Sequence, residues 1–251
     1  MDNYIFWSGG KDSTATIIKC YELGIPVKGI FFVEVMFDIV NGISGENPMH
    51  VEWIKNIAIP KIQSEFGYNV EILHSNKEDY ISLFNQVVRK SKVPCRNGKK
   101  RGFPLGGMCI INDKLKMQPI KTKRKELGEF IELIGIAYDE PKRLARLKPN
   151  ARSILFENFI TEQDALNLCE QYCLLSPIYQ SCKRGGCWFC PNATMRQYAD
   201  FKSKYPDIWA RLEILSKTDN LVSYGFKYAR TFESVNSEID TINNQISIFD
   251  L

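Results

Sequence analysis

A short segment of the chain combines two hydroxyl groups, two glycines and a cation in a way that suits phosphate binding. It reads Ser8-Gly9-Gly10-Lys11-Asp12-Ser13 and lies between an apolar run at 4–7 and a helix-compatible stretch at 14–23. Paired glycines allow the backbone to turn sharply and to approach a ligand closely. The first turn of the following helix offers N–H groups without intrahelical partners and a partial positive charge. The segment therefore predicts an anion site for phosphate or pyrophosphate.

Cysteines in the C-terminal third form the second group with chemical potential. Cys187 and Cys190 have the spacing that places two thiolates on one metal centre, and a proline follows Cys190. Cys109 is the expected third ligand, and Cys182 and Cys95 compete for the fourth position. A cluster that keeps one iron free of protein ligands would need only three cysteines. A cysteine-only centre beside a nucleotide favours a [4Fe–4S] cluster, with zinc as the alternative. Unligated cysteines and a thioredoxin-like dithiol are further alternatives.

Charged residues after two predicted strands extend the candidate site. Glu34 follows one apolar run, and the segment 137–146 follows another. Arg143 and Arg146 in that segment have guanidinium groups, which bind two oxygens of a phosphate or sulfate at once. Because ligands gather beyond the carboxyl ends of parallel strands, these side chains are expected beside the phosphate segment. A purely structural role for 137–146 is the alternative.

The elements that must position these residues alternate between strand and helix. Apolar runs predict strands at 4–7, 27–33, 69–74 and 130–136. Helical spacing predicts helices at 14–23, 49–66 and 78–88, with Pro60 kinking or dividing the second. Repeated strand–helix units imply an α/β fold, a parallel sheet flanked by helices. The remaining pattern predicts helices at 161–175 and 196–215 and a loosely held tail at 234–251.

Length and composition favour one α/β domain with a small appendage, since the chain has 251 residues. We expect a nucleotide-binding domain at 1–160 and a C-terminal helical region with the cysteine cluster at 161–251. No apolar run approaches the ~20 residues that span a membrane. A basic segment followed by an apolar stretch, which would mark a signal peptide, is not visible either. The expectation is a cytoplasmic protein without membrane contact.

Positive charge is concentrated in the middle of the chain. The formal net charge is +4, but the interval 89–125 holds thirteen basic residues against one acid, Asp113. This asymmetry predicts an anionic partner for the interval, with RNA, DNA or another anionic acceptor as candidates. A solvated loop rich in lysine is the alternative.

The phosphate segment has the spacing S-G-G-x-D-S, which resembles the PP-loop of the adenine-nucleotide alpha-hydrolase superfamily. Other segments resemble a subgroup of it, the phosphoadenosine-phosphosulfate (PAPS) reductase-like family. Leu115-Lys116-x-x-Pro119, downstream of Cys109, is similar to that family's cysteine–leucine–lysine–proline element. Ile134-Gly135-Ile136, followed by 139–143, is similar to its glycine–isoleucine–aspartate–arginine element. The order of the motifs matches over roughly residues 3–195.

The resemblance implies a Rossmann-like parallel sheet, an adenine nucleotide as ligand and a phosphate-binding role for residues 8–13. It does not carry over the reductases' reactive thiol, because their Glu-Cys-Gly-Leu-His element is missing and no cysteine follows Cys190. Iron–sulfur members of the family combine a Cys-Cys pair with a Cys-x-x-Cys element, and only the second element is present here.

The leading hypothesis is an enzyme that binds ATP and cleaves it between the alpha and beta phosphates to adenylate an acceptor. Lys11 and the loop N–H groups would stabilise the departing pyrophosphate, and Asp12 would help to hold Mg²⁺. A sulfur donor acting through Cys109 and its metal centre would then displace AMP. One alternative is a sulfonucleotide reductase acting on PAPS or adenosine phosphosulfate (APS). The other is a non-catalytic nucleotide- or nucleic-acid-binding module.

Overall fold

The computed structural model describes residues 1–75, 77–105, 109–182 and 185–249, with side chains up to residue 244. These residues fall into two compact units. Unit 1 comprises Met1–Glu34, Glu46–Ser75 and Lys116–Gly185, and unit 2 comprises Val35–Gly45, Asn76–Leu115 and Gly186–Leu251. The division differs from a single boundary at residue 160, because each unit is assembled from three separate segments of the chain.

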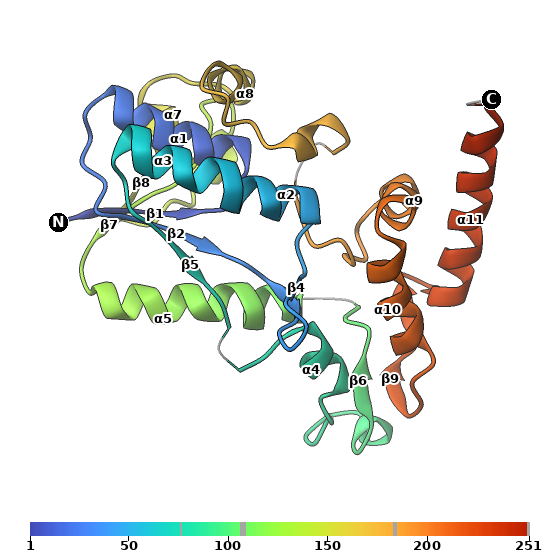
Figure 1. Cartoon of the computed structure of the whole chain (residues 1–251). Coiled ribbons are helices and arrows are strands. Elements are labelled where there is room, and N and C mark those ends of the chain that lie inside the picture. Colours follow the sequence, from blue (N-terminus) through green and yellow to red (C-terminus); the bar gives the residue numbers. More distant parts are fainter. Residues whose placement is uncertain (76, 106–108, 183–184, 250–251) are drawn as a thin grey trace. The chain divides into compact units, whose positions relative to one another are not determined.

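A five-stranded parallel sheet forms the centre of unit 1, with the strand order β5-β2-β1-β7-β8 (Figure 1). The strands are β1 Asn3–Trp7, β2 Gly29–Val33, β5 Val70–Leu73, β7 Ile131–Leu133 and β8 Ala151–Arg152. Neighbouring strands pair in parallel throughout this order. The α/β fold predicted from the alternation of strand and helix patterns is confirmed.

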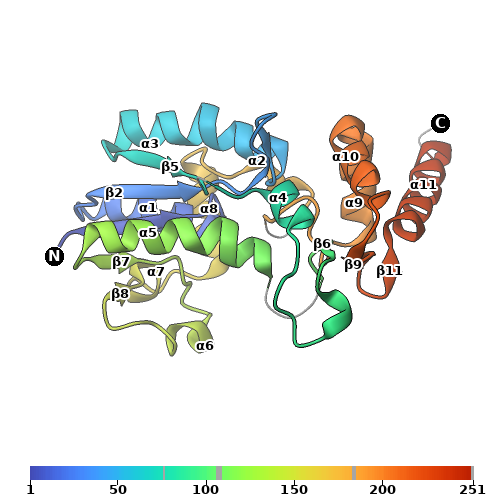
Figure 2. The same cartoon turned by 90° about the horizontal axis from the view of Figure 1, so that it is seen from below.

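Helices cover both faces of this sheet (Figures 1 and 2). They are α1 Lys11–Glu22, α2 Pro48–Trp53, α3 Ile59–Phe66, α5 Gln118–Leu127, α6 Pro141–Leu144, α7 Ile154–Glu157 and α8 Glu162–Gln171. Helices α1, α3, α7 and α8 lie on one face, and α5 lies on the other. The sheet is therefore enclosed between two helical layers, as the mostly apolar runs of β1 and β2 require.

Side chains of β1 alternate between the two helical layers, because successive residues of a strand point to opposite faces. Ile5 and Trp7 are buried in the core formed with residues of α1 and α3. Phe6 points to the other face, where the Arg124 guanidinium of α5 lies 5.1 Å from its ring centroid. This alternation fixes the register of β1 and hence the place where the chain leaves the sheet at Ser8.

The helical stretch from Pro48 to Phe66 changes type in its middle, where Ile54–Ala58 is π-helical. Pro60 follows as the second residue of α3 and has no N–H to donate to the preceding turn. The division that the sequence predicts at Pro60 thus takes the form of a π-helical segment just before it.

Unit 2 combines helices with short strand pairs. The helices are α4 Tyr80–Asn85, α9 Met195–Lys204, α10 Pro206–Ser216 and α11 Phe232–Phe249. The strand pairs are β3 Met36–Asp38 with β4 Ile43–Ser44, β6 Lys100–Gly102 with β9 Leu221–Ser223, and β10 Gly225–Lys227 with β11 Arg230–Thr231. Short helical segments occur at Pro94–Arg96 in unit 2, at Pro177–Gln180 in unit 1, and at Asn112–Met117, which begins in unit 2 and ends in unit 1. The core of unit 2 is rich in aromatic side chains, including those of Phe37, Tyr80, Trp188, Trp209 and Phe226.

The C-terminal residues form helix α11, and the prediction of a loosely held tail at 234–251 is wrong for the described part. Phe232, Val235 and Ile239 recur at helical spacing on α11 and are buried in the core of unit 2. The polar residues between them conceal this narrow apolar stripe, which is enough to dock a helix. Among the described helices, α11 included, none has the length and apolar character needed to cross a membrane.

Candidate functional site

The predicted phosphate segment lies at the point of the sheet where the strand order reverses. From β1 the chain continues to β2 and β5 on one side, and β7 and β8 are added on the other. Ligands of open parallel sheets bind outside the carboxyl ends of the strands at such a reversal. Ser8 directly follows β1 and α1 begins at Lys11, so residues 8–13 occupy this position. We call residues 8–13 the phosphate loop.

Two glycines allow close packing around the phosphate loop. Gly9 adopts a φ of +72°, and a Cβ atom there would lie 2.7 Å from the imidazole ring of His50. Gly135 follows β7, and a Cβ atom there would lie 2.6 Å from backbone atoms of Asp12 and Ser13. A side chain at either position would therefore displace the loop or the first turn of α1.

Serine hydroxyls hold the phosphate loop in a closed turn. The hydroxyl oxygens of Ser8 and Ser13 are 3.0 Å apart. The Gly10 N–H donates to Ser8 Oγ at 3.3 Å, and the Ser8 N–H donates to Ser13 Oγ at 3.3 Å. The Ser13 hydroxyl donates in turn to the Gly10 carbonyl at 3.0 Å. Loop N–H groups are thus paired with oxygen acceptors, the kind of acceptor that a phosphate would also offer.

The first turn of α1 retains backbone donors that a ligand could use. The Lys11 N–H donates to the Tyr179 hydroxyl at 2.8 Å. The N–H groups of Asp12 and Ser13 have no acceptor among the described residues. Gly10 stands at the N-cap position and has no side chain to cap them. An anion at this position would meet two unpaired donors and the positive end of the helix.

Lys11 holds its charge between two carboxylates. Its Nζ lies 2.6 Å from Asp12 Oδ1 and 2.9 Å from Glu162 Oε2. Burial disfavours the charged ammonium, but hydrogen bonds to Asp12 and Glu162 and their charges outweigh burial and raise the pKa of Lys11. Burial also raises the pKa of Asp12, in spite of its bond to Lys11. The cation of the loop is therefore fixed in place, and one of its partners is desolvated.

His50 connects the phosphate loop to a distant segment of unit 1. Its Nδ1 is 2.7 Å from Ser176 Oγ, and its Nε2 is 3.4 Å from the Ser8 carbonyl oxygen. Because a carbonyl only accepts, Nε2 carries the proton and Nδ1 accepts from the Ser176 hydroxyl. Burial lowers the pKa of His50 to about 4, so the ring is neutral at pH 7. The imidazole acts as a neutral spacer behind the glycine turn.

Ser176 and Tyr179 bring two contacts from one short segment to the same loop. The segment is the turn Pro177–Gln180, with Ser176 as its N-cap. Ser176 reaches the loop through His50, and Tyr179 reaches the Lys11 N–H directly. The sequence does not reveal these contacts, because His50 and Ser176 are 126 positions apart and Lys11 and Tyr179 are 168 apart. The rarity of histidine, with two in the chain, was the only signal that pointed to His50.

Glu34 is buried at the carboxyl end of β2, next to β1 in the sheet. Its carboxylate lies 2.9 Å from Lys55 Nζ and 3.9 Å from His74 Nδ1. Burial raises the pKa of the neighbouring Glu46, while the charge of Lys116 lowers it and that of Glu34 raises it. Glu34 thus lies at the carboxyl end of its strand, as the sequence predicts. Contact between Glu34 and a nucleotide stays a prediction.

The segment 137–146 holds part of its charge in an internal ion pair. Arg143 Nη1 donates to both carboxylate oxygens of Glu140 at 2.7 Å. Glu140 also accepts from the Ala137 N–H at 3.2 Å. Arg146 is exposed. The bond to Glu140 involves only Nη1 of Arg143, and the predicted role of both arginines in phosphate binding stays a prediction.

The expected metal ligands are not gathered into one site among the described residues. Cys187 and Cys190 belong to unit 2, in a turn where the Cys190 N–H donates to the Cys187 carbonyl at 3.0 Å. Cys109 also belongs to unit 2 and is exposed, as is Cys95, whereas Cys182 belongs to unit 1. No three His, Cys, Asp or Glu side chains of the described residues come together so that they could hold a metal ion. Thiols suit zinc or iron, but this set is incomplete, so we assign no chemical step to a metal centre.

Tyr80 is a buried tyrosine on which the charges of two of these thiols, Cys109 and Cys187, act. Its hydroxyl is buried and has no hydrogen-bond partner among the described residues. Burial raises the pKa of Tyr80 well above its ordinary value, and the charges of Tyr198, Cys187 and Cys109 add to the effect. Cys109 and Cys187, which are far apart in sequence, therefore both act on one buried hydroxyl.

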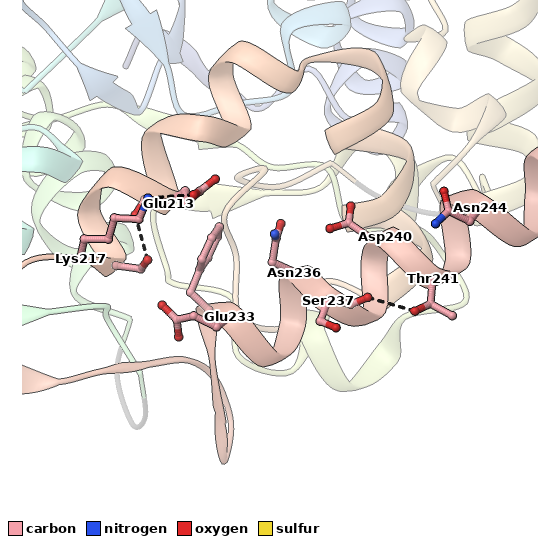
Figure 3. A pocket seen from close by; sticks show the side chains of 10 residues that line it. Glu213, Lys217, Glu233, Asn236, Ser237, Asp240, Thr241 and Asn244 are labelled. Carbon is pink, nitrogen blue, oxygen red and sulfur yellow. Dashed lines mark hydrogen bonds and ion pairs between the residues drawn. The ribbon is translucent and has the colours of Figure 1, made fainter.

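A cavity of about 430 Å³ lies between α10 and α11 of unit 2 (Figure 3). Glu213, Glu233 and Asp240 are among the side chains that line it, and Lys217 Nζ is 2.9 Å from Glu213. Its described lining includes no residue predicted to bind a nucleotide or a metal. Carboxylates predominate among its charged groups, so the cavity is not suited to a phosphorylated ligand.

Comparisons with known proteins found a solved structure of low similarity and no matching family model or curated protein. No protein-family model matches the chain. No curated protein matches it. Among solved structures, the chain is similar to the U34-tRNA thiolase NcsA from Methanococcus maripaludis with its [4Fe-4S] cluster, at 18% identity and a TM-score of 0.39. That match covers 97% of this chain and 72% of the other. Membership of the PAPS reductase-like family stays a prediction.

Proposed function

We propose that this protein is an enzyme that binds ATP, or a related adenine nucleotide, through the phosphate loop and cleaves it between the alpha and beta phosphates. The observation that carries the proposal is the pair of unpaired N–H groups of Asp12 and Ser13 at the strand-order reversal. Gly135 supports it, because the backbone approaches this turn at a distance that leaves no room for a Cβ atom. Such a turn is built for an anion rather than for side-chain packing.

A phosphate competes well with the loop's own contacts. The hydroxyls of Ser8 and Tyr179 are neutral acceptors for the N–H groups of Gly10 and Lys11. Hydrogen bonds to neutral groups contribute about 0.5–1.5 kcal/mol each, and those to charged groups about 1.5–3 kcal/mol. Replacement of the hydroxyls by phosphate oxygens is therefore favourable, and the loop is already folded around the position that the phosphate would take.

The residues of the loop would favour departure of pyrophosphate. An oxygen of the acceptor would attack the alpha phosphorus, and the bond to the oxygen that bridges the alpha and beta phosphates would break. Lys11 and the free N–H groups would stabilise the charge that develops on the leaving group. Asp12 would hold the Mg²⁺ that accompanies the nucleotide, since protein sites for this ion often supply one or two carboxylates. A sulfur donor would then displace AMP from the adenylated acceptor.

Titration with ATP and magnesium tests nucleotide binding, with Ser13→Ala as the loop variant. Removal of this hydroxyl is expected to weaken ATP binding by roughly ten- to a hundredfold, or about 1.5–3 kcal/mol. Ser64→Ala is the matched control, because Ser64 is an exposed serine of α3 in the same unit. Equal ATP affinity in the two variants would reject the phosphate loop as the binding site.

Product analysis separates the proposed reaction from its alternatives. Labelled ATP with candidate acceptors is expected to give AMP and pyrophosphate. Release of sulfite from PAPS or APS with a dithiol would favour a sulfonucleotide reductase instead. Tight ATP binding without either product would favour a non-catalytic module.

The cysteine centre is a separate part of the proposal. We propose that Cys109, Cys187 and Cys190, three thiols of unit 2, hold a [4Fe–4S] cluster, and Cys182 as a fourth ligand stays a prediction. Protein purified without oxygen is then expected to be brown and to contain iron and acid-labile sulfide. Stoichiometric zinc without colour would favour the zinc alternative, and the absence of both metals would reject the centre.

A further inference from the structure

Residues 86–101 of unit 2, from the end of α4 into β6, form an antiparallel ribbon, which we call the basic ribbon. The Val88 N–H donates to the Lys99 carbonyl at 2.9 Å, and the Gly98 N–H donates to the Val88 carbonyl at 2.9 Å. At its base the Arg101 N–H donates to the Gln86 carbonyl at 2.9 Å. These hydrogen bonds hold the backbone of the ribbon in a defined conformation, so the Cα atoms from which its side chains extend have defined positions.

The basic ribbon carries many cations and no acid. Its seven basic residues are Arg89, Lys90, Lys92, Arg96, Lys99, Lys100 and Arg101. None of them forms an ion pair with a carboxylate of the described residues. Like charges in so short a segment repel one another, and an isolated ribbon of this kind gains from a polyanion that neutralises them.

Four of these cations converge on one cavity. Arg89, Lys90, Arg96 and Arg101 line a pocket of about 840 Å³, together with Ser91. Arg101 Nη2 donates to the Gln86 side chain at 2.7 Å, whereas its buried Nε has no hydrogen-bond partner among the described residues. The pocket therefore combines four positive charges with an unused guanidinium donor and an alcohol.

We propose that the pocket and the ribbon around it bind the phosphodiester backbone of a nucleic acid. A guanidinium fork matches two oxygens of one phosphate, and three of the four cations that line the pocket are arginines. Lys92, Lys99 and Lys100 continue the positive charge along the ribbon, which suits a chain of phosphates better than a single ion. Nucleic acids present such a repeat of negative charge, and cationic contacts to it supply most of the non-specific affinity.

This inference does not depend on the proposed reaction, because the ribbon and the phosphate loop belong to different units. Binding is measured without ATP, so a failure here would leave the phosphate loop untouched. Conversely, loss of ATP binding in Ser13→Ala has no bearing on the ribbon.

The test is titration of the full chain with labelled single-stranded RNA and DNA of 20 nucleotides over a range of salt concentrations. Four phosphate contacts predict a slope of about −3 in a plot of log affinity against log salt, since each contact adds ~−0.7 for a single strand. The double variant Arg89→Gln with Arg96→Gln is expected to make this slope shallower by about 1.4. Its melting temperature serves as the check that the ribbon remains folded.

Arg196→Gln is the matched control, because Arg196 is an exposed arginine of unit 2 outside the pocket. Its affinity and salt slope are expected to equal those of the unchanged protein. An unchanged slope in the double variant, or an equal loss in the control, would overturn the proposal. Displacement of the labelled strand by inorganic phosphate or by polyglutamate at equal charge would also overturn it, because the site would then bind any anion or any polyanion.

Discussion

Lys11 in the phosphate loop and Arg89 in the basic ribbon carry the same charge in opposite surroundings. Lys11 is held between Asp12 and Glu162, whereas Arg89 is exposed and has no carboxylate partner among the described residues. A cation fixed by carboxylates has a defined position, and its partners weaken its field at long range, so it acts on a group bound beside it. A group of unpaired cations has the reverse properties, because its field reaches toward solvent and attracts anions from a distance. The difference suggests that the loop is organised for positioning and the ribbon for capture.

Paired and unpaired cations also occur within the basic interval 89–125, although the sequence shows the same kind of charge throughout it. In its second half, Lys123 Nζ lies 2.9 Å from Glu71, and Arg124 lies 2.6 Å from Glu132. These pairs belong to unit 1 and attach α5 to the sheet. These two cations of the second half therefore stabilise the fold of unit 1, and the anionic partner expected for the interval stays a prediction.

Neutralisation of one cation from each half tests the contrast most strongly. Arg124→Gln leaves the buried Glu132 without its partner and is expected to lower the free energy of unfolding by about 3 kcal/mol. Arg89→Gln removes an exposed charge and is expected to change it by less than about 0.5 kcal/mol. Urea denaturation measures both. A similar cost in the two variants would remove the distinction between paired and unpaired cations.

His50 makes the stability of unit 1 depend on pH, because burial lowers the pKa of its ring to about 4. Between pH 6.5 and about 4 the unfolded ring gains a proton and the folded ring does not, so stability falls as pH falls. The displacement of the pKa from 6.5 to about 4 corresponds to about 3 kcal/mol, lost in full below the folded value.

His50→Gln should therefore lose less stability than the unchanged protein between pH 7 and pH 4, as measured by urea denaturation at both pH values. Arg89→Gln is the control, since arginine stays charged throughout this range. If His50→Gln loses as much stability as the unchanged protein over this interval, the neutral imidazole is not the source of the sensitivity.

Gly9 in the phosphate loop and Gly98 in the basic ribbon both have a positive φ, but only Gly9 has close neighbours where a Cβ atom would lie. Gly9→Ala places a Cβ atom against His50 and is expected to weaken ATP binding roughly thirtyfold, or ~2 kcal/mol. Gly98 in the ribbon has a φ of +81° and nothing within 4 Å of the same position, so Gly98→Ala shares the backbone strain without the collision. Calorimetric titration with ATP should show a loss in the first variant alone. Equal losses would mean that strain, and not the packing of the loop, explains the effect.

Tyr179→Phe has the smallest expected effect. It tests whether the Lys11 N–H donates to a phosphate of the nucleotide in place of the Tyr179 hydroxyl. Loss of the hydroxyl is expected to cost about 1 kcal/mol of stability. ATP affinity should stay the same or rise a few-fold, because the phosphate no longer competes with the tyrosine. Tyr138→Phe, at an exposed tyrosine, is the control. A tenfold loss of ATP affinity would instead show that the Tyr179 hydroxyl assists the nucleotide.

Local patterns were enough to predict four of the five strands of the sheet, all but β8, and the strand–turn–helix order around residues 8–13. The apolar run before Ser8 and the glycines after it specify a strand, a turn and a helix start, and the structure has β1 and α1 there. Pro206 separates α9 from α10 within the helical stretch predicted around it. Such features depend on a few adjacent residues, so the sequence exposes them directly.

The contacts that His50, Ser176 and Tyr179 make around the phosphate loop could not be predicted, because they join segments that are distant in the sequence. Ser176 and Tyr179 act on residues more than a hundred positions away, and nothing in their own neighbourhood marks them. The division of the basic interval has the same origin, since Glu71 and Glu132 neutralise α5 only once the sheet has formed. The apolar stripe of α11 was hidden by its polar neighbours until the core of unit 2 gave it a surface to pack against.

The interleaving of the two units has a consequence for synthesis and for dissection of the protein. The sheet-bearing unit needs residues up to Gly185, and its companion needs Val35–Gly45 from an early part of the chain. A ribosome must therefore release most of the polypeptide before either unit is complete. A single cut after Gly185, whether by a protease or by a truncated gene, leaves the three segments of the sheet-bearing unit on one fragment but divides its companion. No single cut therefore yields both units whole.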